Sequence, residues 1–149
     1  MATEQRHILV VDDNPADFAL TMEAAIGHAH LRLHHVADAI DALAWLARQG
    51  RYRDAVCPDL ILLDLNMPKI DGLSLLQALK RSSWSNIPII MFTTSAREED
   101  RRAAIERGAI AFWSKPHTLD GLLRLMDAVG DWAAGTRSLD HLADHGTCG

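Results

Sequence analysis

The sequence is poor in three features that would each place it in a large class of proteins. It has two cysteines, Cys57 and Cys148, which are too few for a disulfide framework and predict reduced thiols. No hydrophobic run is long enough for a signal peptide or a transmembrane helix. Basic residues are not in excess, since the net charge is −5, which argues against binding to a nucleic acid backbone. We therefore expect a cytoplasmic protein that binds neither membrane nor nucleic acid.

Apolar runs and helix-like segments alternate along the chain, and 48% of its 149 residues are hydrophobic, which is enough for one core. Residues 8–11, 60–63 and 89–92 are continuously apolar, as expected for strands that helices cover on both faces. Residues 31–36 and 110–113 are mixed runs. Five strand–helix units predict an α/β fold, a doubly wound parallel sheet with the flavodoxin-like strand order 2-1-3-4-5.

Local signals mark where several helices begin or end. Asn14 followed by a proline predicts a helix start, with the negative charge of Asp17 in the first turn. Residues 95–98 have the form of a capping box, and Gly108 is placed to end the helix that follows. Thr118 is in position to cap the last helix.

Three acidic residues follow two strands that the predicted topology makes neighbours. Asp12 and Asp13 come directly after the first strand, and Asp64 comes after the third. Ligands of doubly wound sheets bind at the carboxyl ends of the strands beside such a switch point. Each acid alone is explained by turn or helix capping, but three close carboxylates repel unless a cation neutralises them. The cluster therefore predicts a Mg²⁺ site with open coordination positions.

Two further polar residues end the remaining inner strands. Thr93 ends the fourth strand, and Lys115 follows the fifth. Alone, each is explained as a surface lysine or a strand-end hydroxyl. Beside three acids, the ammonium supplies charge and the hydroxyl supplies a hydrogen-bond donor for a phosphoryl group.

The order and spacing of these motifs resemble the receiver domain of two-component response regulators over residues 6–133. The matching segments are Val10 to Asn14, Asp64 to Pro68, Asp71-Gly72, Phe92-Thr93 and Lys115-Pro116.

The resemblance implies the role of each site residue. Asp64 would be the phosphoacceptor for a histidine kinase. Asp13, Asp64 and the main-chain carbonyl of Asn66 would bind Mg²⁺, and Asp12 would act mostly through water. Thr93 and Lys115 would contact the phosphoryl group.

Phe112 stands where this family has an aromatic switch residue, and its simpler explanation is a core aromatic. The resemblance also implies a cis peptide bond between Lys115 and Pro116. The segment from Leu62 to Lys69, the loop before the third strand and the doubled threonine at 93–94 resemble the single-domain regulators paired with phytochrome-type histidine kinases.

Two other functions stay open. A hydrolase or phosphotransferase with an aspartyl nucleophile shares this topology, but it usually has a second acid two residues later, where this chain has Asn66. A phosphorylation-independent adaptor would keep only the fold, and the intact acid cluster argues against it. As a receiver, the protein is not expected to be an enzyme beyond catalysing its own phosphorylation and dephosphorylation.

The last predicted helix has a second apolar stripe that a helix with one buried face does not need. Its members are Leu125, Ala128 and Trp132, and Trp113 on the expected edge strand extends it. We read Trp113, Leu125 and Trp132 as a homodimer interface. The alternative is that residues 138–142 fold back over Trp132 within the monomer.

Residues 134–149 are predicted to be a short tail, too short for an output domain. The signal is then expected to leave by contact, with a downstream phosphotransfer protein as one candidate target. His34 and His35 belong to the second strand and are expected at the surface, away from the predicted site.

Overall fold

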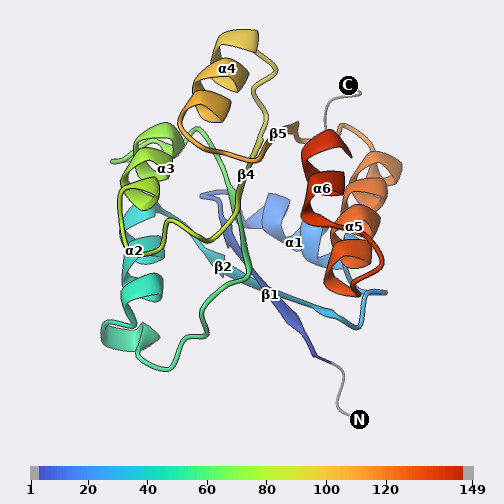
Figure 1. Ribbon diagram of the computed structural model, residues 1–149, viewed down its shortest axis with the longest axis horizontal. Coiled ribbons are helices and arrows are strands. Elements are labelled where there is room, and N and C mark those ends of the chain that lie inside the picture. Colours follow the sequence, from blue (N-terminus) through green and yellow to red (C-terminus); the bar gives the residue numbers. More distant parts are fainter. Residues whose placement is uncertain (1–3, 146–149) are drawn as a thin grey trace.

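A computed structural model describes residues 4–145, and its centre is one parallel sheet of five strands (Figure 1). The strands are β1 (Arg6–Val11), β2 (Leu31–Val36), β3 (Leu60–Leu63), β4 (Ile89–Thr93) and β5 (Ala111–Ser114). The helices are α1 (Pro15–Ala24), α2 (Ala39–Ala47), the 3-10 turn η1 (Gly50–Tyr52), α3 (Gly72–Lys80), α4 (Glu98–Glu106), α5 (Leu119–Ala133) and α6 (Leu139–His145). The strand order is β2-β1-β3-β4-β5, which confirms the predicted fold.

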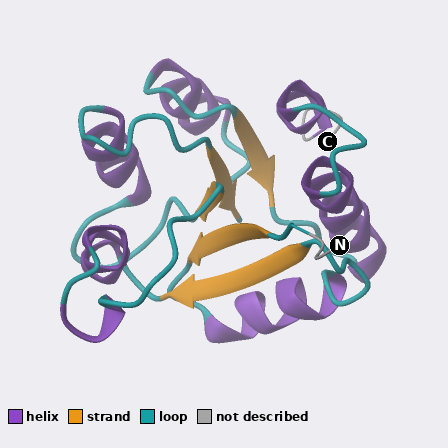
Figure 2. Cartoon of the chain, turned by 60° about the horizontal axis from the view of Figure 1, so that its bottom comes forward, coloured by secondary structure: helices purple, strands orange, loops and turns teal. Residues whose placement is uncertain are grey.

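Helices cover both faces of the sheet (Figure 2). Ile8 and Val10 of β1 point to one face and pack in a core with α1, α5 and α6. Leu9 and Val11 point to the other face and pack in a core with α2, α3 and α4. Successive side chains of a strand alternate between faces, so a strand buried on both sides is apolar throughout.

The register of the inner strands places their carboxyl ends at one edge of the sheet. Val11, the last residue of β1, pairs with Leu63, the last residue of β3. Leu63 in turn pairs with Met91 of β4, and Thr93 pairs with Ser114 of β5. The residues that follow β1 and β3 therefore emerge side by side.

Three of the predicted helix boundaries are confirmed. The Asn14 side chain accepts hydrogen bonds from the backbone N–H groups of Ala16 at 3.0 Å and Asp17 at 3.2 Å. The Thr118 hydroxyl accepts one from the N–H of Gly121 at 3.1 Å. Gly108 follows the end of α4 with φ of 107°, a left-handed conformation that favours glycine.

The capping box predicted over residues 95–98 is wrong. The Ser95 hydroxyl accepts from the N–H of Arg97 at 3.3 Å and donates to the Asp100 carboxylate at 2.6 Å. Arg97 is the N-cap residue of α4, and its side chain makes no cap hydrogen bond. The serine shapes the turn before the helix instead of capping the helix, since the helix begins later than the motif suggests.

The second apolar stripe of α5 is covered within the chain, which contradicts the premise of the predicted dimer interface. Trp113 is 0% exposed, Leu125 is 7% exposed and Trp132 is partly buried. Helix α6 packs against α5 and β5, with Leu142 fully buried among them. The Trp113 indole N–H donates to the Leu142 carbonyl at 3.3 Å. The tail therefore folds back over this surface, and Trp113 and Leu125 are not available for a partner in this conformation.

Two expectations from composition concern membrane-spanning helices and cysteines. Within residues 4–145, no helix is both long and apolar enough to cross a membrane. Cys57 is an exposed free thiol, and Cys148 lies outside the described residues.

Candidate functional site

The structure brings the three predicted acids together at the carboxyl edge of the sheet. Carboxylate oxygens of Asp12, Asp13 and Asp64 lie within 4.8 Å of one another. Asp12 and Asp64 are 3% and 7% exposed, whereas Asp13 is exposed. The cluster arises because each acid follows one member of the paired ends of β1 and β3.

Local backbone contacts shape the two acidic loops. The N–H of Asn14 donates to Asp12 Oδ1 at 2.9 Å, and the N–H of Asn66 is 3.4 Å from Asp64 Oδ1. Gly72 begins α3 directly against the Asp64 main chain, where a Cβ atom would overlap the Asp64 carbonyl. The glycine of the Asp71-Gly72 motif is therefore required by close backbone approach at the site.

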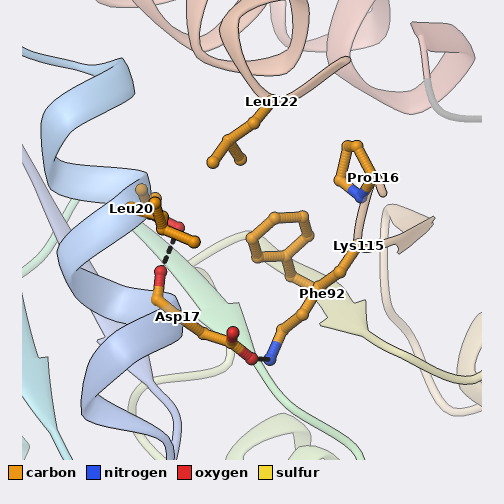
Figure 3. A pocket seen from close by; sticks show the side chains of 7 residues that line it. Asp17, Leu20, Phe92, Lys115, Pro116 and Leu122 are labelled. Atoms are coloured by element: carbon orange, nitrogen blue, oxygen red, sulfur yellow. Dashed lines mark hydrogen bonds and ion pairs between the residues drawn. The ribbon is translucent and has the colours of Figure 1, made fainter. Parts of the chain in front are cut away.

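Lys115 points into the acid cluster and contacts three carboxylates. Its Nζ atom lies 2.7 Å from Asp12, 2.9 Å from Asp17 and 3.5 Å from Asp64. Figure 3 shows the ammonium meeting the Asp17 carboxylate from α1, with Phe92 and other apolar side chains nearby. Asp17 is one site residue that sequence reasoning missed, because its place in the first turn of a helix already explained it.

Burial governs the charges of this cluster. It raises the pKa of the Asp64 carboxyl; the Lys115 ammonium offsets part of that rise, and the charge of Asp12 adds to it. Burial alone would lower the pKa of Lys115, but hydrogen bonds to Asp12 and Asp17 and the charge of Asp64 raise it overall. Lys115 is thus a cation at neutral pH, and the acids around it outnumber it.

His35 supports the site from β2, contrary to the expectation that it lies away from it. Its Nε2 atom is 2.7 Å from the main-chain carbonyl of Asp12. A carbonyl oxygen only accepts, so Nε2 carries the hydrogen in this contact. The His35 ring also stacks on Phe18 of α1, with ring centroids 4.4 Å apart and planes 10° apart. Only the spatial neighbourhood of β1 and β2, and not a sequence motif, reveals this contact.

The remaining predicted residues lie on β4 and β5. Thr93 is fully buried at the end of β4, and its hydroxyl is 3.4 Å from the N–H of Ser95. Phe112 is 7% exposed and packs in the core beneath α2, α3 and α4. The peptide bond between Lys115 and Pro116 is trans, which corrects the cis bond implied by the resemblance.

The donor set of the site fits a hard divalent cation. Carboxylate oxygens are the ligands that Mg²⁺ and Mn²⁺ prefer, and three of them converge here. Asp13 is exposed, so the cluster is open to solvent on one side and leaves room for water or a ligand oxygen. Lys115 lies on the buried side of the same cluster, where it meets Asp12 and Asp64.

Comparison with known proteins gives one consistent result. Residues 8–127 match the sequence model of the response regulator receiver domain. Response regulator Rcp1 of Synechocystis sp. is 35% identical over 127 residues, which cover 82% of this chain and 84% of Rcp1.

Two solved structures are similar over almost their whole length. The Mn²⁺-bound form of Rcp1 matches with a TM-score of 0.80 and 32% identity, covering 90% of this chain and 98% of that one. The phosphorylated cyanobacterial phytochrome response regulator RcpA matches with a TM-score of 0.81 and 31% identity, covering 90% and 97%.

Proposed function

Because this chain belongs to the response regulator receiver domain family, we propose that Asp64 accepts a phosphoryl group from a histidine kinase with the help of Mg²⁺. The observation that carries the proposal is the setting of Asp64. Its carboxylate is buried directly after β3, beside the acids that follow β1 and 3.5 Å from the ammonium of Lys115. This is an arrangement for a group that gains negative charge and needs a cation beside it.

The Asp64 carboxylate acts as the nucleophile. One of its oxygens bonds to phosphorus while the bond between phosphorus and the kinase histidine nitrogen breaks. Because Asp64 reacts as the ionised carboxylate, it has no proton to lose. Lys115 is held beside Asp64 and meets the incoming phosphoryl oxygens. The residues that would hold Mg²⁺ are Asp12, Asp13, Asp64 and the main-chain carbonyl of Asn66. When bound, the ion supplies positive charge that offsets the repulsion between the phosphoryl group and the acids.

Phosphorylation then acts as a switch, and the only reactions catalysed are the protein's own phosphorylation and dephosphorylation. The buried Thr93 hydroxyl, which already hydrogen-bonds the Asp64 carboxylate, contacts the phosphoryl group attached there, and Phe112 in the neighbouring strand reorients. Both residues lie on the strands beside α4 and α5. Their movement alters the surface formed by α4, β5 and α5, which passes the signal to another protein.

The kinase is proposed to be of the phytochrome type. The support is the similarity to RcpA, which is described as a phytochrome response regulator. A downstream phosphotransfer protein remains a candidate target. The homodimer stays a prediction, and its interface has to lie outside Trp113 and Leu125 as long as α6 covers them.

The site argues against the two other functions. A hydrolase would need a general acid near the nucleophile, but residue 66 is an asparagine whose N–H faces Asp64. A phosphorylation-independent adaptor would gain nothing from burying two acids and a lysine together, because such groups lose solvation.

The direct test is phosphotransfer from a phytochrome-type histidine kinase labelled with radioactive phosphate. We expect label on the wild-type chain in Mg²⁺, and none in excess chelator, on Asp64→Asn or on Asp13→Ala. Asp54→Asn is the matched control, since the Asp54 side chain is 96% exposed and outside the site. Full transfer to Asp64→Asn would overturn the proposal. Failure of the wild type to bind beryllofluoride would favour the adaptor.

A further inference from the structure

We propose that Asp17 of α1 is a positioning residue for phosphorylation, because it anchors the Lys115 ammonium so that one N–H is left facing Asp64. The inference rests on the proposed function of Asp64. It concerns an acid outside the three that converge on the candidate metal site. An ammonium has three N–H donors, and the structure places three carboxylates around this one.

The three contacts are unequal. Asp12 and Asp17 lie at 2.7 and 2.9 Å, the range of strong charge-assisted hydrogen bonds, whereas Asp64 lies at 3.5 Å. Two of the three N–H donors therefore form short hydrogen bonds, and the third makes only a long contact. Because this third donor faces Asp64, a phosphoryl oxygen attached to Asp64 can form the short contact that the carboxylate itself does not form.

Asp17 is itself held in place. Its backbone N–H donates to the Asn14 side chain, and its carbonyl accepts from the Thr21 hydroxyl at 3.0 Å. The next residue, Phe18, stacks on His35 of β2. The first turn of α1 is thus fixed both to its own N-cap and to the sheet, so the anchor of Lys115 does not depend on a mobile loop.

The surroundings of Lys115 make its contact with Asp17 more important. The lysine side chain is 11% exposed and lies in a small pocket with Leu20, Phe92 and Leu122 around it (Figure 3). Asp12 and Asp17 are the two carboxylates at short distance from the ammonium, so loss of the Asp17 charge leaves Asp12 as the one short ionic partner. The ammonium is then free to move onto the Asp64 carboxylate, which it would pair with and make a poorer nucleophile.

An acid in the first turn of a helix also stabilises the helix, and the test has to separate this effect from positioning. Asp17→Asn removes the charge at constant size, and Asp17→Glu keeps the charge. The double variant Ala16→Asp, Asp17→Asn returns an acid to the first turn at an exposed position without the contact to Lys115. The full chain is used throughout, with beryllofluoride affinity and the rate of phosphorylation by phosphoramidate, both in saturating Mg²⁺, as readouts.

We expect Asp17→Asn to weaken beryllofluoride binding and slow phosphorylation by roughly three- to tenfold, because a neutral amide oxygen holds the ammonium less tightly than the carboxylate does. Asp17→Glu should recover most of this, and the double variant should not. In the wild type, the Lys115 ammonium should give a proton signal in slow exchange with water, and Asp17→Asn should lose it.

Three results would overturn the inference, and they differ in what else they refute. An Asp17→Asn variant equal to the wild type, or a double variant restored to wild-type rates, would refute the role of Asp17 alone. In the second case the acid would act by stabilising helix α1 and not by its contact with Lys115. A wild-type chain that binds no beryllofluoride would refute the proposed function together with the role of Asp17 in it.

Discussion

The carboxyl edge of β1 and β3 and the corner formed by β5, α5 and α6 are both buried, but different groups fill them. At the edge, Asp12 and Asp64 share one ammonium, and burial raises the pKa of Asp64. At the corner, Trp113 and Leu142 are fully buried among apolar side chains, and the indole N–H reaches a carbonyl. Burial of the charged groups at the edge costs solvation free energy, whereas burial of the apolar side chains at the corner is favourable.

The contrast indicates where the free energy of folding comes from and where part of it is lost. Apolar burial at the corner stabilises the fold, and α6 covers the apolar stripe of α5 that the helix pattern alone predicts to be exposed. Clustered acids at the edge repel one another, and a bound cation, alone or with a phosphoryl group, relieves this repulsion. Substitutions in the two regions should therefore respond differently to Mg²⁺, which is the basis of the predictions below.

The largest effect is expected for Lys115→Met, which keeps the stem of the side chain and removes its charge. Asp12 is 3% exposed and would lose its short ionic partner, so we expect the free energy of unfolding to fall by about 3 kcal/mol. Urea denaturation in chelator measures the loss, and Mg²⁺ should restore part of it. Arg53→Met is the control, since Arg53 is 83% exposed. A loss no larger than the control's would show that the acids are not held as buried charges.

Leu142→Ala tests the corner and should destabilise the protein by about 2 kcal/mol, because it removes a fully buried side chain where α6 meets α5 and β5. Mg²⁺ should not restore this loss. Leu123→Ala, at a position 37% exposed on α5, should cost much less. Urea denaturation gives the two values, and a red shift of tryptophan fluorescence would report exposure of Trp113. Equal small losses would mean that α6 does not cover the corner in solution.

Sequence reasoning succeeded where a short local pattern decides the structure. Strands buried on both faces are continuously apolar, so residues 8–11, 60–63 and 89–92 identified the sheet. Acids directly after such strands lie close to one another, because the parallel register brings the strand ends together. Asp12, Asp13 and Asp64 were therefore predictable as a cluster.

The missed features depend on contacts between distant segments. An apolar stripe such as that of Leu125 shows that a helix has a second partner, but not whether this partner belongs to the same chain. The contacts of Asp17 with Lys115 and of His35 with Asp12 span different elements and depend on side-chain reach. The capping motif at Ser95 failed because α4 begins later, at Glu98, and the Ser95 hydroxyl shapes the turn before it.

The smallest effect is expected at Asp64, and it has the opposite sign. A raised pKa means that the folded state binds the Asp64 proton more tightly than the unfolded state does, so ionising Asp64 costs stability. Asp64→Asn removes this cost while Lys115 keeps its short contacts to Asp12 and Asp17. In chelator at pH 7, we expect the variant to be more stable than the wild type by about 1 kcal/mol.

The pH dependence and the comparison with Asp12 make this last expectation specific. The advantage of Asp64→Asn should vanish below the ordinary aspartate pKa of 3.8 and grow as the pH rises through the raised value, where the wild type loses stability. Asp12→Asn should not stabilise, because Asp12 accepts hydrogen bonds from both Asn14 and Lys115. Thermal unfolding between about pH 3 and pH 7 measures both. Mg²⁺ should reduce the advantage, since it stabilises the wild type by binding and the variant lacks one ligand. An Asp64→Asn variant that is less stable than the wild type at every pH would mean that the edge, like the corner, is built for stability.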